Sequence, residues 1–142
     1  MMKRFLYALI AAAIILPVSL VAQNKNKDKK MNEITAVALY DAFRSDAEQA
    51  AKKYGMKTML ISGVAVNVGP DVYGLPSVEV ASKEGESCKA LCVLPFLDYL
   101  KLRKVSKRDN VVIQGQVRGY AEEYDLVVVK QSVIISVNGK KL

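Results

Sequence analysis

Residues 57–70 read KTMLISGVAVNVGP, and this stretch decides the fold. It is long, apolar and rich in β-branched residues, which favours a strand, and Gly63 stands near its centre. A similar stretch, NVVIQGQVRGY, follows at 110–120 and carries Gly115 in its middle. Two long strands that each bend at an internal glycine predict a small, coiled β-barrel.

The rest of the chain supplies shorter strands and helical segments. Apolar residues in the N-terminal part recur at three- and four-residue spacings, which is typical of helix. Ser45 to Glu48 fit a capping box, where a second helix is expected to begin. Alternation in SVEVAS places Val78 and Val80 inward and Glu79 outward. The remaining elements are expected as strands at 77–82, 88–96 and 126–137 and as one or two helical turns within 97–110.

The resulting order is helix, three strands, short helix and two strands. This is the order of an OB-fold. We therefore expect a mainly β (α+β) chain, a five-stranded OB-fold Greek-key barrel with an N-terminal helical segment and a short helix between strands three and four. The expected organisation is a signal peptide at 1–22, a polar Lys/Asn linker at 23–31, the helical segment at 32–54, the barrel at 55–137 and a tail at 138–142.

The first 22 residues predict an export signal. Lys3 and Arg4 precede an apolar run from Phe5 to Leu16, and a small residue, Ala22, stands before Gln23. An uncleaved anchor is the alternative, because the apolar segment is close to the lower limit for a membrane span, about 17 residues. No lipobox cysteine lies near the cut. The protein is therefore expected to be exported, periplasmic or secreted, and to touch a membrane only through the signal segment if that segment is not cleaved.

Most of the net charge of +7 belongs to the N-terminus. Residues 31–142 carry 15 basic and 13 acidic side chains, which leaves +2. The run QNKNKDKK at 23–30 holds four lysines and no apolar residue, which predicts a solvated linker. A sequence-independent nucleic-acid binder needs a dense basic surface, so nucleic acid is not the expected partner of this domain.

The residue types present also limit the chemistry. The chain has no histidine and two cysteines, so it offers no Ser-His or Cys-His nucleophile pair and no four-cysteine zinc site. Cys88 and Cys92 would lie about 13 Å apart on one strand, beyond the reach of a disulfide, although a local turn at Ala90 would reverse this. Cys92 is expected to be buried and Cys88 to be the more exposed thiol. We expect no enzyme activity, no metal site and no cofactor.

The run AEQAAKKYGMKTMLISGVAVNV at 47–68 resembles a known family, the exported bacterial tRNA_anti-like proteins, named for their likeness to the tRNA-anticodon-binding fold. Members carry an alanine-rich helix, a Lys-Tyr-x-x-Lys step and a strand with a central V/I-x-G-x-V. The step is matched by residues 53–57 and the strand core by residues 61–64. The segments LCVLPF and VVIQGQVRG also fit, so the resemblance covers about residues 32–135. It implies the fold and an exported protein, and it does not transmit an activity. The chain departs from lipid-anchored members in lacking a lipidation cysteine.

An OB barrel usually binds on the face of its second and third strands and through the loops that join strands one–two and four–five. Those loops are 69–76 and 119–125 here, and their tyrosines can stack on bases or sugar rings or, alternatively, cover the barrel rim. The candidate ligand-binding residues are Tyr73, Lys89, Arg118, Tyr120 and Tyr124. The expected function is a non-catalytic envelope module for an unidentified ligand or protein partner. The alternative is a single-stranded nucleic-acid or oligosaccharide binder that uses the mouth formed by loops 69–76 and 119–125.

Two charged clusters complete the inventory. Glu122, Glu123 and Asp125 lack the spacing of a calcium loop and predict a solvated turn. The one dense basic cluster of the domain is expected to be a solvated helical face or a docking patch for an acidic partner or a phosphate headgroup. It consists of Lys101, Arg103, Lys104, Lys107 and Arg108.

Overall fold

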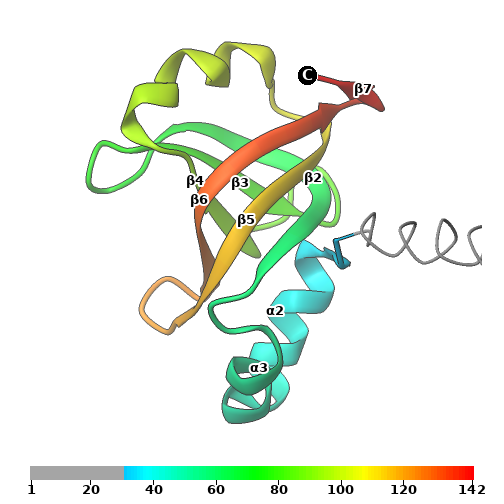
Figure 1. Ribbon diagram of the computed structural model, residues 1–142, viewed down its shortest axis with the longest axis vertical. Coiled ribbons are helices and arrows are strands. Elements are labelled where there is room, and N and C mark those ends of the chain that lie inside the picture. Colours follow the sequence, from blue (N-terminus) through cyan, green and yellow to red (C-terminus); the bar gives the residue numbers. More distant parts are fainter. Residues whose placement is uncertain (1–30) are drawn as a thin grey trace, which may run out of the picture. The chain divides into compact units, whose positions relative to one another are not determined.

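The computed structural model describes residues 31–142 (Figure 1). The expected signal segment and residues 23–30 of the expected linker lie outside the described residues. The elements are β1 (Glu33–Thr35), α2 (Ala36–Ser45), α3 (Ala47–Tyr54), β2 (Thr58–Pro70), β3 (Pro76–Ala81), β4 (Ala90–Val93), the 3₁₀ helix η2 (Phe96–Lys104), β5 (Asn110–Ala121), β6 (Leu126–Val137) and β7 (Lys140–Lys141).

Five of these strands close into a barrel. β2 pairs antiparallel with β5 through its first half and with β3 through its second half. β3 pairs with β4, β4 runs parallel to β6, and β6 pairs with β5. The order β2-β3-β4-β6-β5 therefore returns to β2. This is the OB-fold arrangement, and it confirms the fold predicted from the sequence.

Gly63 marks the place where β2 changes partner. Gly63 lies opposite Val111 of β5, and the next residue, Val64, lies opposite Ala81 of β3 as well as Asn110 of β5. A Cβ atom on Gly63 would lie 2.5 Å from the Ala81 carbonyl oxygen, which leaves no room for a side chain. The central glycine of the stretch 57–70 is thus required by the close approach of β3.

The N-terminal segment differs at its start from the helical segment expected at 32–54. Residues 33–35 form β1, which runs parallel to Leu60–Ser62 of β2. A strand this short depends on its pairing partner, and its own sequence carries no strand signal. The Thr35 Oγ1 atom accepts a hydrogen bond from the Ala38 N–H and caps α2. The expected second helix is present as α3, but the capping box predicted Ser45 as its cap. Instead, the Asp46 carboxylate accepts a hydrogen bond from the Gln49 N–H, and the helix begins at Ala47.

α2 and η2 cover opposite ends of the barrel (Figure 1). α2 buries Leu39, Tyr40 and Phe43 and contacts all five barrel strands. η2 buries only Leu102, and α3 buries only Ala50. Residues 31–142 therefore form one compact unit with its own core. Within that unit, no helix has the length and apolar content to cross a bilayer.

Two boundaries at the C-terminal side of the barrel also differ from expectation. The expected strand at 88–96 is limited to β4, since residues 86–88 belong to the β3–β4 connection and Pro95 is the N-cap of η2. The expected tail at 138–142 contains β7, which pairs with β6. Asn138 and Gly139 take left-handed conformations, with φ of 51° and 80°, and reverse the chain there.

Candidate functional site

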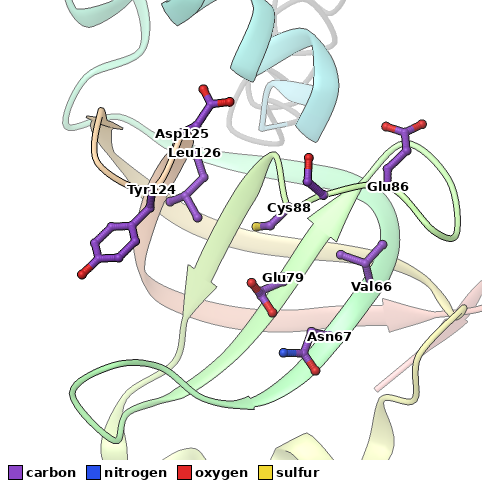
Figure 2. A pocket seen from close by; sticks show the side chains of 9 residues that line it. Val66, Asn67, Glu79, Glu86, Cys88, Tyr124, Asp125 and Leu126 are labelled. Carbon is purple, nitrogen blue, oxygen red and sulfur yellow. The ribbon is translucent and has the colours of Figure 1, made fainter.

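A groove crosses the barrel face formed by β2, β3 and β4. Its floor is a row of residues paired across the strands: Asn67 lies opposite Glu79, and Glu79 lies opposite Leu91. Two hollows of about 700 and 330 Å³ share Asn67, Glu79, Tyr124 and Leu126, so they form one continuous feature. Figure 2 shows the larger hollow. This is the face on which OB-folds bind ligands.

A β-bulge shapes the floor of the groove. The register of β2 against β3 shifts between Ala65 and Asn67, so Val66 is an extra residue in β2. Val66 and Asn67 both line the groove (Figure 2). On β3, Glu79 faces outward between the fully buried Val78 and Val80, as the alternation predicted.

Three loops form the walls. Residues 86–88 come from the β3–β4 connection and residues 124–126 from the β5–β6 turn. Asp71 comes from the β2–β3 loop. The Asp71 carboxylate accepts hydrogen bonds from the backbone N–H groups of Tyr73 and Leu75, at 2.8 and 2.9 Å, which holds that loop in a tight turn.

The lining of the groove is acidic. Among residues 31–142, no lysine or arginine lines either hollow, whereas four carboxylates do: Asp71, Glu79, Glu86 and Asp125. Asp71 is bonded to its own loop, the Glu86 carboxylate accepts a hydrogen bond from the Ser82 hydroxyl at 2.6 Å, and Asp125 has partners on α2. Glu79 has neither a hydrogen bond nor an ion pair with any described residue. Its carboxylate is therefore the one most available to a ligand.

Asp125 fixes the turn between β5 and β6. Its backbone is left-handed, with a φ of 53°. Its carboxylate accepts hydrogen bonds from the hydroxyls of Tyr40, at 2.8 and 2.9 Å, and Tyr120, and from Nη1 of Arg44 at 2.9 Å. These donors, Tyr120 first and then Tyr40, lower the pKa of Asp125 to about 2. The same hydrogen bonds raise the pKa of both tyrosines. Because Tyr40 and Arg44 belong to α2, this helix holds one wall of the groove.

The two cysteines are free thiols. Cys92 is fully buried, as predicted. Cys88 is the more exposed of the two, as predicted, and it is half-buried because it faces the groove from the β3–β4 connection (Figure 2). Burial, aided by the charge of Glu79, raises the pKa of Cys88 to about 12, and burial raises the pKa of Cys92 as well. Burial therefore favours the protonated form of both thiols, which is the poorer nucleophile.

The residues predicted to bind ligand do not all meet at one mouth. Tyr124 lines both hollows. Tyr73 is exposed at the tip of the neighbouring loop and does not line them, although Asp71 and Val72 beside it line the smaller one.

The other three predicted residues lie away from the groove. The Tyr120 ring packs edge-on against Tyr40 of α2, with 6.4 Å between ring centroids, and its hydroxyl is bonded to Asp125. The Lys89 Nζ atom lies 4.3 Å from the centroid of the same Tyr40 ring. Arg118 is exposed and lines neither hollow. Tyr120 and Lys89 thus belong to the contact between α2 and the barrel.

The described residues do not form a metal centre. No group of three or more histidine, cysteine or acidic residues within 31–142 is placed to hold an ion. Glu122 and Glu123 are exposed on the turn, while Asp125 points to Tyr40 and Arg44.

Comparison with known proteins agrees with this architecture. The model of the tRNA_anti-like family matches residues 1–133. The chain belongs to the tRNA_anti-like family. Among solved structures, the chain is similar in fold to a proposed nucleic acid-binding lipoprotein from Klebsiella pneumoniae, with a TM-score of 0.59 and 14% identity over 75% of this chain and 92% of that chain. At this identity the likeness shows the shared fold alone.

Two weaker likenesses have TM-scores below 0.5. The OBody AM3L15, bound to hen egg-white lysozyme, has a TM-score of 0.42 and 19% identity over 59% of this chain and 80% of that chain. A proposed aspartyl-tRNA synthetase from Leishmania major has a TM-score of 0.49 and 14% identity over 80% of this chain and 22% of that chain. A search of curated proteins finds no match.

Proposed function

We propose that this tRNA_anti-like chain is an exported, non-catalytic binding module of the cell envelope that takes its ligand in the groove. The observation that carries the proposal is Glu79. Its carboxylate has no hydrogen-bond or ion-pair partner among residues 31–142, and it lies at the centre of the floor, between Asn67 and Leu91. The groove around it combines apolar side chains, such as Val66 and Leu126, with further carboxylates. A ligand with a cationic group and apolar neighbours, such as a basic segment of an envelope protein, complements this lining.

Export is supported by the signal-like pattern of residues 1–22. A further support is the Klebsiella relative, which is a lipoprotein of the same fold. The module is thus periplasmic or secreted in this proposal. Residues 23–30 would serve as a polar linker between the signal segment and the barrel.

The groove is a poor match for nucleic acid. A phosphate backbone placed along the floor would lie beside Glu79 and Asp71, and no lysine or arginine of the described part of the chain lines the groove to neutralise it. The two cations predicted for this mouth are elsewhere: Lys89 lies over the Tyr40 ring, and Arg118 lies outside the lining.

A neutral oligosaccharide is the second candidate, and one observation favours it. The Tyr124 ring is half-exposed at the edge of the groove and projects from the turn (Figure 2). An exposed aromatic ring of this kind can stack on a sugar ring without any need for a basic groove.

The non-catalytic assignment is supported by what the chain offers as reactive groups. It has no histidine, and both thiols have raised pKa values. Neither a paired nucleophile nor a thiolate is therefore present to start a covalent reaction.

Fluorescence anisotropy with labelled probes tests the proposal on residues 31–142. A labelled oligolysine peptide is expected to bind, and Glu79→Gln is expected to weaken binding at least fivefold. Glu48→Gln, on the solvent side of α3, is the matched control and should bind as the wild type does. Binding of a labelled chitooligosaccharide to the wild type, together with loss of that binding in Tyr124→Ala, would instead support the second candidate. Binding of neither probe would reject the groove as a site for both ligand classes.

A further inference from the structure

η2 carries an exposed apolar surface at the end of the barrel away from α2 (Figure 1). Phe96 is 66% exposed, Leu97 92%, Tyr99 40% and Leu100 67%. Single exposed apolar residues are normal on soluble proteins, but four within five consecutive positions form a patch, and such patches mark interaction sites. None of these residues lines the groove.

The geometry of the 3₁₀ helix keeps this patch outside the core. With three residues per turn, side chains three positions apart lie above one another. Leu97, Leu100 and Arg103 therefore form one outward ridge. Phe96, Tyr99 and Leu102 form a second row, in which Phe96 and Tyr99 stay exposed and only Leu102, 7% exposed, is buried and anchors the helix to the barrel. The barrel thus holds η2 through a single buried leucine and leaves the apolar ridge free.

A basic cluster borders the apolar ridge. It comprises Lys101, Arg103, Lys104, Lys107 and Arg108, all exposed. Only two of these five basic side chains form an ion pair with a described acidic residue. Lys101 pairs with Asp98 at 3.2 Å, and Arg108 pairs with Glu84 at 2.7 Å. Asp109 is bonded to the Ser106 N–H and the Asn138 side chain. Arg103, Lys104 and Lys107 have no ion pair among the described residues.

We infer that this η2 surface, residues 96–108, docks the domain onto an anionic phospholipid membrane. Leu97, Leu100 and Phe96 would enter the boundary between headgroups and acyl chains, while the unpaired basic side chains contact headgroup phosphates. An acidic protein would match the basic side chains, but it would also need an apolar surface to cover the strongly exposed Leu97 and Leu100. A lipid interface offers apolar and anionic layers together. The sequence offered a phosphate headgroup as one of two partners for the basic cluster, and the exposed apolar ridge beside it favours that choice. This contact is independent of the groove.

Vesicle binding tests the inference on residues 31–142, because the apolar run and the lysines of residues 1–30 would bind membranes by themselves. The chain has no tryptophan, so Leu97→Trp supplies a single reporter. We expect its emission to shift to the blue with vesicles of phosphatidylcholine and phosphatidylglycerol, and not with phosphatidylcholine alone. Added salt should weaken the binding. Met56→Trp, an exposed position next to α3, should show no shift.

Two double variants separate the apolar and the charge contributions in a sedimentation assay with the same vesicles. Leu97→Ser with Leu100→Ser should weaken binding at least tenfold. Lys104→Gln with Lys107→Gln should weaken it roughly thirtyfold, at about fivefold for each lysine. Lys52→Gln with Lys53→Gln, on α3, is the charge-matched control and should bind as the wild type does.

Three results would overturn the inference. The first is that the wild type does not bind the anionic vesicles. The second is that it binds neutral vesicles as tightly as anionic ones. The third is that the α3 control variant loses as much binding as the η2 variants do. Retention on immobilised polyglutamate without vesicle binding would assign the η2 surface to an acidic macromolecule and would also overturn it. Circular dichroism of each variant establishes that a loss of binding is not a loss of folding.

Discussion

Replacing Leu39 with alanine tests whether α2 is an integral part of the barrel core. Leu39 is fully buried, and its helix contacts all five barrel strands. Leucine-to-alanine changes in cores cost about 2–5 kcal/mol, because apolar contacts are lost and a cavity remains. With no exposed surface and neighbours on every side, Leu39→Ala is expected to lie in the middle of that range, about 3–4 kcal/mol. For a domain of this size the melting temperature should fall by roughly 10–15 °C.

Urea unfolding of residues 31–142 measures this loss. Far-UV circular dichroism reports the whole domain, and the tyrosine near-UV signal includes Tyr40 on α2. Both should give one coincident transition, shifted to lower urea with an unchanged slope. Leu97→Ala, the same change at an exposed position, is the matched control and should alter the free energy of unfolding by less than about 0.5 kcal/mol.

Two results would refute this reasoning. A loss below about 1 kcal/mol in Leu39→Ala would mean that α2 packs loosely on the barrel. A tyrosine transition that precedes the main one would mean that α2 detaches while the barrel stays folded. In either case α2 does not hold the Asp125 turn, and the wall of the groove has another support.

Three further predictions follow from single sites. Gly63→Val places side-chain atoms against the Ala81 carbonyl oxygen and should lower the free energy of unfolding in urea by about 1–3 kcal/mol. An unchanged urea midpoint would contradict the role of Gly63 where β2 changes its pairing partner. Asp125 has a folded pKa of about 2, below its ordinary 3.8, so wild-type stability should fall as pH drops from about 4 to about 2. Melting curves of Asp125→Asn should lack this component, and identical pH profiles would disprove the hydrogen bonding at the turn. Cys88 and Cys92 should resist a thiol reagent at pH 7.5 in the native protein and react after unfolding, whereas rapid native labelling would show that the β3–β4 connection opens.

The strand order was predictable because its signals are local. The stretch 57–70 carries its glycine where β2 changes partner, and the alternation around Glu79 matches a strand with one buried face. The presence of a second helix was predictable for the same reason, since cap and helix are adjacent in the chain, although Asp46 and not Ser45 is the cap. Each of these features follows from a few neighbouring residues.

The site was predictable only in its location on the fold. Asp125 and Tyr40 are 85 positions apart, and no local pattern links them. From the sequence, Tyr120 could face either a ligand or an internal carboxylate. It is bonded to the Asp125 carboxylate because its ring packs against Tyr40 of α2. The bulge at Val66 and the strand β1 depend on their pairing partners, so the residues around them carry no signal of either.

The most direct test of the groove as a site for cationic rather than nucleic-acid ligands is a ¹⁵N NMR titration of residues 31–142. At low salt, an oligolysine peptide is expected to shift the backbone signals of Asn67, Glu79 and Leu91 in a saturable way. Oligothymidine is expected to leave those three signals in place. Saturable shifts of the same signals with oligothymidine, or oligolysine shifts confined to other parts of the barrel, would contradict the proposed function.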